Sequence, residues 1–85
     1  RAVLAVPLFG DSSATPAIAQ LCQKHDLALI EDIAQALGAH TRDTNGRCQQ
    51  AGTMGDISTA SFYPTKTLGA AGDAGAVISS RADLL

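Results

Sequence analysis

The sequence has little charge and no cluster of basic residues. Only 16% of its 85 residues are charged, and the formal net charge is −2. Proteins that bind nucleic acid or an anionic membrane surface need clustered lysine and arginine, so neither partner is expected. No apolar run approaches the roughly 20 residues that cross a bilayer, and the first residues do not resemble a secretory leader. We therefore expect a cytoplasmic protein.

Cysteine and histidine are also scarce. Cys22 and Cys48 lack C-x-x-C spacing, and Cys22 falls on the apolar stripe of an expected helix, which favours structural roles over redox or metal binding. His25 and His40 lie far apart in the chain and match no metal-ligand spacing. We expect no metal centre.

The glycine pattern near the end of the sequence excludes another class of site. Gly69, Gly72 and Gly75 do not follow the G-x-G-x-x-G pattern, so a dinucleotide-binding fingerprint is not supported. The sequence has no internal repeat and no linker, which indicates part of a single domain. It also begins without methionine, and Ser80 and Asp83 have the spacing of a helix start that is then cut off. We expect a fragment that is marginal alone.

Short apolar runs alternate with one amphipathic segment in the first third of the sequence. Residues 2–6 form a continuous apolar run typical of a buried strand. Thr15 has the place of an N-cap with Pro16 at the first helical position, which predicts a helix over about residues 16–25. Residues 27–30 predict a second buried strand. A parallel strand–helix–strand unit, and hence an α/β fold, follows.

Four further elements are expected after this unit. Asn45-Gly46 is a hairpin-turn dipeptide. The expected elements are a short helix over 33–37, a hairpin of segments 39–42 and 47–50, a strand over 57–62 and a strand over 76–79.

Lys66 is the first candidate site residue. Most lysines are solvated surface groups, but this one follows an expected strand, and the only other charged residue between Ile57 and Ile78 is Asp73. Such a setting suits an amine that forms an imine with a carbonyl group. The sequence around Lys66 therefore allows both a surface lysine and a catalytic one.

Three other residues are candidates with ordinary alternatives. Glu31 and Asp32 come directly after the second expected strand, at the carboxyl end where parallel sheets bind ligands. Asp32 could be a helix cap or a solvated loop acid, or it could keep the pyridine nitrogen of a cofactor protonated. Ser61 could be a small strand residue or a ligand of the cofactor phosphate, and its sequence context leaves both open.

Three segments together resemble the DegT/DnrJ/EryC1/StrS family of sugar aminotransferases, which depend on pyridoxal 5'-phosphate. The segments are Glu31-Asp32-Ile33-Ala34-Gln35-Ala36, Ser61-Phe62-Tyr63-Pro64-Thr65-Lys66 and Leu68-Gly69-Ala70-Ala71-Gly72-Asp73-Ala74-Gly75. Their order and spacing both match the family pattern. The resemblance extends from the strand at Ala2 to the strand that ends at Ser79.

This resemblance implies a fold and a set of roles. The fold is the aspartate-aminotransferase type (fold type I), with a mostly parallel sheet and flanking helices. Residues 1–85 are then part of the large cofactor-binding domain, without the N-terminal segment and the small C-terminal domain. Lys66 is the Schiff-base lysine, Asp32 the partner of the pyridinium nitrogen, Gln35 a contact of the cofactor ring and Ser61 a phosphate ligand.

The resemblance also implies the reaction and the assembly. The amino donor is L-glutamate, the acceptor is a nucleotide-linked keto sugar in amino-sugar biosynthesis, and the enzyme is a homodimer with sites completed across the interface. Lys66 favours transamination, because sister enzymes that dehydrate sugars have histidine there. Pro7, Leu37 and Thr67 depart from the family pattern, which bears on the substrate rather than on the cofactor.

Three alternatives stay open on the sequence. One is another enzyme of the same fold, such as a cysteine desulfurase or an amino-acid aminotransferase, although the Glu-Asp-x-Ala-Gln segment disfavours it. Another is a regulatory or sensory protein that binds the cofactor without turnover. The last is a fragment with no activity of its own.

Overall fold

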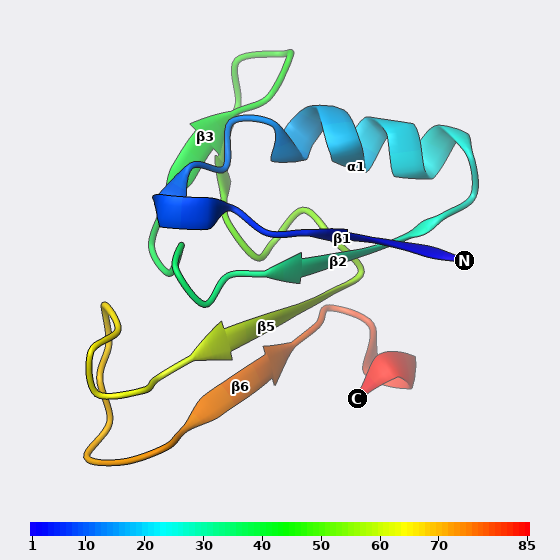
Figure 1. Cartoon of the computed structure of the whole chain (residues 1–85). Helices are drawn as coiled ribbons and strands as arrows, with labels where there is room; N and C mark the ends of the chain where they lie inside the picture. The colour runs from blue at the N-terminus through cyan, green and yellow to red at the C-terminus, as the bar shows by residue number, and fades with distance from the viewer.

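The computed structural model describes all 85 residues and contains one four-stranded sheet (Figure 1). The first three strands in the order β1-β2-β5-β6 are parallel, and β6 runs antiparallel to β5. The expected mostly parallel sheet is confirmed, with β1 and β6 as its outer edges. The strands are β1 Ala2–Ala5, β2 Ala28–Asp32, β5 Ile57–Ser61 and β6 Gly75–Ile78.

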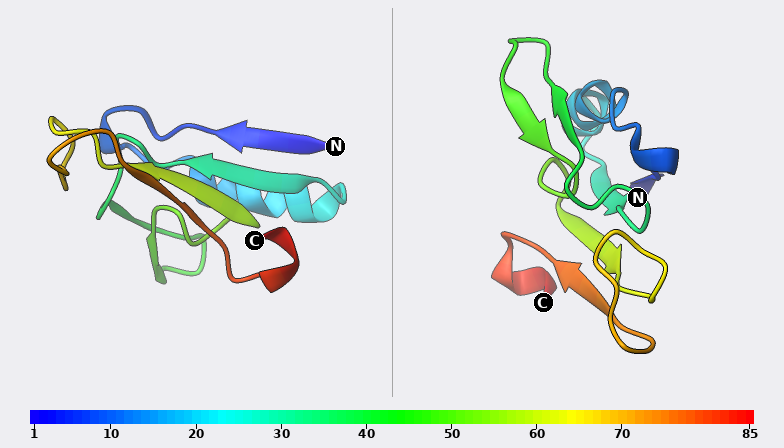
Figure 2. Two further views of the ribbon diagram at one scale, coloured as in Figure 1. Left: turned by 90° about the horizontal axis from the view of Figure 1, so that it is seen from below. Right: turned by 90° about the vertical axis from the view of Figure 1, so that its left-hand side faces the viewer.

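Helix α1, Thr15–Lys24, connects β1 to β2 and packs against both strands (Figures 1 and 2). Its apolar stripe and the sheet close a small core around three buried residues, Ala5, Cys22 and Leu29. Cys22 is a buried free thiol, as the helical pattern predicted, whereas Cys48 is exposed. The predicted strand–helix–strand unit is confirmed.

The start of α1 differs from the sequence-based expectation. Ala14 is the N-cap, and no side chain caps the helix, so the prediction of Thr15 as N-cap is wrong. Thr15 is already helical and buried, and its backbone N–H donates to the carbonyl of Ser12 at 3.0 Å. The preceding turn therefore satisfies one of the backbone donors that have no partner within the first turn of the helix.

A separate two-stranded hairpin lies between β2 and β5 in the sequence. Strands β3, His40–Arg42, and β4, Cys48–Gln50, pair antiparallel, as the Asn45-Gly46 dipeptide predicted. Gly46 has a φ of +78°, which glycine adopts without strain. The Asp43 carboxylate accepts the backbone N–H groups of Asn45 and Arg47, which fixes the turn.

The short helix expected over residues 33–37 is not present, and this prediction is wrong. The segment is a series of turns, in which Ala36 N–H donates to the carbonyl of Ile33 at 3.0 Å. Ile33 N–H instead extends the sheet by donating to Thr59 at 2.8 Å. Gly38 then takes a φ of +83° and reverses the chain. Ile33 and Ala36 belong to the second core cluster, together with Ala51 and Ala60.

Two short 3₁₀ segments complete the structure, η1 at Leu8–Gly10 and η2 at Ala82–Leu84. The residue before η2 is Arg81, so the prediction of Ser80 as the cap of an α-helix is wrong. The Arg81 guanidinium bonds Asp83 at 2.7 Å and Asp56 at 3.3 Å, and this ion pair folds the end of the chain onto the sheet. No helix has the length and apolar character to cross a membrane.

Candidate functional site

The carboxyl ends of the parallel strands β1, β2 and β5 meet at one edge of the sheet (Figure 1). Open parallel sheets bind their ligands beyond this edge. Asp32 is the last residue of β2 and Ser61 the last residue of β5, so both lie there. The structure thus places these two predicted residues on neighbouring strands.

Asp32 and its neighbour Glu31 point to opposite faces of the sheet, because side chains alternate along a strand. The expectation that both follow the strand is wrong, since both lie within β2. Asp32 is half-buried, and one carboxylate oxygen accepts the N–H of Ala34 at 3.0 Å. Its other oxygen has no protein partner. Asp32 is therefore fixed in place and still has an acceptor to offer a ligand.

Glu31 is fully buried and serves the fold instead. Its carboxylate accepts three backbone N–H groups, from Gly52 at 2.8 Å, Met54 at 2.7 Å and Gly55 at 2.6 Å. Three such donors compensate a buried negative charge without a cation. Gly52 has a φ of +87°, which glycine adopts without strain. Glu31 thereby anchors the segment that leads into β5.

Gln35 lies in the turns after β2 and contacts the loop that follows β1. Its side-chain Oε1 accepts the backbone N–H of Phe9 at 3.1 Å. The Nε2 group donates to no other part of the protein. Gln35 therefore joins two of the loops at the carboxyl edge and keeps a donor available.

Lys66 lies in the loop 62–74 between β5 and β6, which backbone contacts close at its base. The N–H of Phe62 donates to Ala74, and the carbonyl of Phe62 accepts from Ala70, both at 2.8 Å. Lys66 N–H donates to Tyr63 at 2.8 Å, and its half-buried side chain forms no salt bridge. The amine is therefore not committed to a carboxylate.

Ser61 stands directly before this loop. Its hydroxyl oxygen accepts the N–H of Tyr63 in a long contact of 3.4 Å, which leaves the hydroxyl hydrogen for another acceptor. Asp32, Gln35, Ser61 and Lys66 all lie on or just after the carboxyl ends of β2 and β5. No hydrogen bond joins any two of them, so they are held separately by the backbone.

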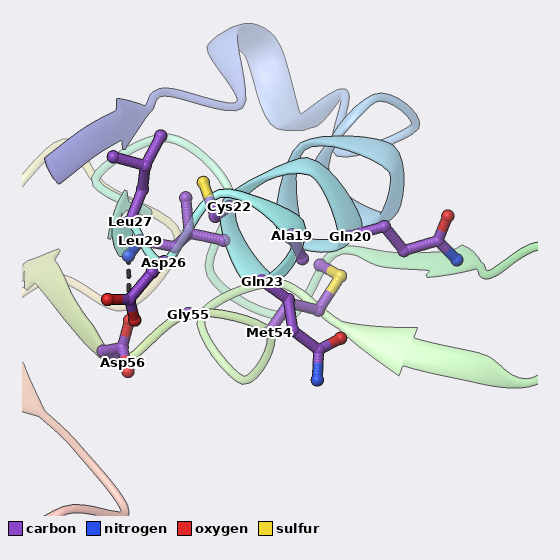
Figure 3. Close-up of a pocket in the computed structure, with 10 residues that line it drawn as sticks. All are labelled: Ala19, Gln20, Cys22, Gln23, Asp26, Leu27, Leu29, Met54, Gly55 and Asp56. Atoms are coloured by element: carbon purple, nitrogen blue, oxygen red, sulfur yellow. Dashed lines mark hydrogen bonds between the residues drawn. The ribbon is translucent and has the colours of Figure 1, made fainter.

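A separate hollow lies between α1 and the segment 54–56 (Figure 3). It has a volume of about 480 Å³ and is open, and it faces the start of β2 and β5 rather than their carboxyl ends. Asp56 on its rim accepts the N–H of Leu29 at 2.8 Å. This bond, and the Arg81 guanidinium after it, hold the pKa of Asp56 below its ordinary value. The hollow lacks a free acid–base pair, so we assign the site to the carboxyl edge.

Sequence reasoning missed two contributors to this edge. One is the backbone N–H of Phe9, whose role depends on a left-handed backbone conformation at a non-glycine residue. The other is the anchoring role of Glu31. Strand alternation could have separated Glu31 from Asp32, whereas no sequence signal marks the Phe9 contact.

Comparison with known proteins links this chain to one family. The model of the DegT/DnrJ/EryC1/StrS aminotransferase family matches residues 1–84. A UDP-N-acetyl-3-dehydro-alpha-D-glucosamine 3-aminotransferase from Acidithiobacillus ferrooxidans is 48% identical over 84 residues, which are 99% of this chain and 21% of that protein. A pleiotropic regulatory protein from Geobacillus stearothermophilus is 43% identical, again over 99% of this chain and 21% of that protein.

A solved structure agrees with the sequence comparisons. DesV from Streptomyces venezuelae, in complex with a ketimine intermediate, is 40% identical to this chain and superimposes with a TM-score of 0.79. The match covers 99% of this chain and 21% of DesV. The chain thus spans about a fifth of the length of the relatives that it matches.

Proposed function

The chain belongs to the DegT/DnrJ/EryC1/StrS aminotransferase family, and we propose that the protein carrying it transfers an amino group to a sugar with the help of pyridoxal 5'-phosphate. The acceptor in this proposal is a nucleotide-linked keto sugar, and the donor is L-glutamate. The relative from Acidithiobacillus ferrooxidans, named for a UDP-linked amino sugar, supports the acceptor. The fold is the aspartate-aminotransferase type, as predicted.

One observation carries the proposal: Lys66 lies in the loop that follows β5, and β5 pairs with β2, the strand that ends in Asp32, at the carboxyl edge of the sheet. An amine without an ion-pair partner and a carboxylate with one unused oxygen are the two groups that a pyridoxal enzyme requires. Their positions on adjacent strand ends follow from the parallel pairing of β2 with β5. A surface lysine has no need of this placement.

The chemistry of the four side chains fits the cofactor. Pyridoxal phosphate, when bound, supplies a carbonyl group that takes up an amino group and a ring that accepts electrons. In our proposal Lys66 would hold the cofactor through Nζ, with the carbonyl oxygen leaving as water, and Nζ would later carry a proton during amino transfer. Asp32 would keep the ring nitrogen protonated, Gln35 Nε2 would donate to the ring, and the Ser61 hydroxyl would donate to the phosphate.

The assembly and the location belong to the same proposal. We take the chain as part of the large domain of a homodimer whose sites are completed across the interface, and the parent protein as cytoplasmic. The support is the family resemblance, together with the fifth of its relatives that the chain spans. We therefore expect the isolated 85 residues to be inactive.

A second candidate is a regulatory protein that binds the cofactor without turning it over. The 43% identity to the pleiotropic regulatory protein from Geobacillus stearothermophilus favours it. A turnover assay with L-glutamate and keto-sugar nucleotides distinguishes the two, because a regulator keeps the cofactor bound and transfers no amino group.

The test uses the full-length parent protein loaded with pyridoxal phosphate. Borohydride should fix the cofactor covalently to the wild type, with the label on the peptide that contains Lys66, and the Lys66→Ala variant should not be labelled. Lys24→Ala is the matched control, because Lys24 is the only other lysine of the chain and lies on α1. Equal labelling of wild type and Lys66→Ala, or no labelling of either, would refute the assignment of Lys66.

A further inference from the structure

The turn after β1 has an unusual backbone. Phe9 has a φ of +56° and a ψ of 20°, and Gly10 has a φ of +83°, so two consecutive residues are left-handed. Glycine takes this conformation freely, whereas an L-residue such as phenylalanine pays roughly 1–2 kcal/mol. Within these 85 residues the phenyl ring is 88% exposed, so no contact made by this chain compensates the strain. Backbone strain without a packing reason points to a functional constraint.

The strained turn aims one backbone donor at a site residue. Phe9 N–H donates to Gln35 Oε1 at 3.1 Å, across 26 positions of the sequence. The turn itself is closed by Gly10 N–H to Pro7 at 3.2 Å and by Asp11 N–H to Leu8 at 3.1 Å. The contact therefore joins a hydrogen-bonded turn to the exposed side chain of Gln35.

This contact decides which way the amide of Gln35 faces. A backbone N–H can be met only by the carbonyl oxygen of the amide, so Oε1 must lie toward Phe9 and Nε2 away from it. Nε2 has two hydrogens to donate and no acceptor lone pair. Gln35 consequently presents only donors to whatever lies beyond it at the carboxyl edge.

We propose that the Phe9-Gly10 turn is a positioning element that orients the Gln35 amide, so that Nε2 donates to an acceptor oxygen on the cofactor ring. The inference rests on the proposed function, in which Gln35 contacts that ring. An amide held in one orientation does not have to be ordered when the cofactor binds, so the turn raises affinity through pre-organisation.

The test is a double-mutant cycle on cofactor affinity in the full-length parent protein. Gly10→Val cannot keep a φ of +83°, whereas Gly10→Asn tolerates it and serves as the matched control. A Cβ at position 10 lies 3.6 Å from the carbonyl oxygen of Gln35, an ordinary contact, and asparagine places the same Cβ there. Each change is made with Gln35 and with Gln35→Ala, and the Kd for pyridoxal phosphate is measured by absorbance titration.

We expect Gly10→Val to raise the Kd about tenfold when Gln35 is present, the loss of about one hydrogen bond, and less than twofold in the Gln35→Ala background. Gly10→Asn should stay within threefold in both. The same loss in both backgrounds, or no loss with Gln35 present, would overturn the inference. Failure of the proposed function is distinguishable, because wild type would then show no borohydride label on Lys66.

A second variant keeps the inference testable if Gly10→Val does not fold. Gln35→Glu retains an oxygen for Phe9 N–H but presents no donor on its other side. It should weaken cofactor binding at least tenfold and move the pH midpoint of the visible absorbance band upward, while hydrogen exchange of Phe9 N–H stays slow. An unchanged Kd and an unchanged midpoint would show that Nε2 does not reach the cofactor.

Discussion

Replacing Glu31 by glutamine removes a buried charge with little change of shape. One side-chain oxygen remains and can still accept the N–H groups of Met54 and Gly55. The new NH₂ group faces the N–H of Gly52, which loses its acceptor at a cost of about 1–3 kcal/mol. The other two bonds become neutral rather than charge-assisted, a further loss of roughly 1 kcal/mol each. We therefore expect the segment 52–55 to lose about 3–5 kcal/mol of local stability.

Amide hydrogen exchange in the parent protein measures this loss directly. Protection of the backbone N–H groups in residues 52–55 should fall by roughly 10²- to 10³-fold or more, since about 1.4 kcal/mol corresponds to a factor of ten. Asp26→Asn is the matched control, because it removes the same charge from an exposed residue whose φ of +52° asparagine tolerates. Protection of α1 should stay unchanged in both variants.

The reasoning about Glu31 has a clear failing result. If Glu31→Gln lowers the protection of residues 52–55 by less than fivefold, or by no more than Asp26→Asn does, then the carboxylate does not hold this segment. The three short contacts would then be a consequence of the chain path and not its cause.

Other substitutions test the contacts that hold the sheet and the loop of Lys66 in place. Asp56→Ala leaves the buried N–H of Leu29 without the acceptor that it has at 2.8 Å. In urea unfolding of the parent protein, this variant should lose about 1–3 kcal/mol of stability. Asp83→Ala should have a smaller effect, because it removes only an exposed partner of Arg81. The pKa of Asp56 is lowered, chiefly by the hydrogen bond from the Leu29 N–H. The contribution of Asp56 to folding stability is therefore present at neutral pH and is lost as the pH falls through the lowered pKa. The urea midpoints of wild type and Asp56→Ala should converge below about pH 4. Gly69→Ala puts a Cβ 2.5 Å from the carbonyl oxygen of Pro64 and should displace the loop of Lys66, which slows borohydride labelling, while Gly72→Ala meets nothing within 4 Å and should label like wild type.

Sequence patterns of neighbouring residues predicted the strands and the hairpin turn correctly. The two apolar runs became β1 and β2, because a continuous apolar segment gains most when it is buried. Asn45-Gly46 became the turn of the hairpin, because glycine adopts the required positive φ without strain. The segment 33–37 has helix-forming residues but did not form a helix. Five residues are too few to repay helix nucleation, and the Asp32 carboxylate and Ile33 N–H already engage other partners.

The side chains of the candidate site could be named from the sequence, whereas one backbone contact could not. The sequence named Asp32, Gln35, Ser61 and Lys66, and the structure places all four at the carboxyl edge; their contacts with a cofactor stay a prediction. The contribution of Phe9 could not be predicted, because it comes from a backbone N–H and a strained φ. Residue type does not encode either of these.

The two outer strands of the sheet have a consequence for handling the 85-residue chain by itself. β1 pairs only with β2, and β6 only with β5, so each molecule has two free backbone edges on opposite sides. Exposed Leu4 on one outer strand and Val77 on the other add apolar contact next to these edges. A molecule with two such ends behaves like a bifunctional monomer in polymer chemistry. Concentrated solutions of the isolated chain should therefore grow into open-ended filaments, whose length rises with concentration, rather than close into dimers.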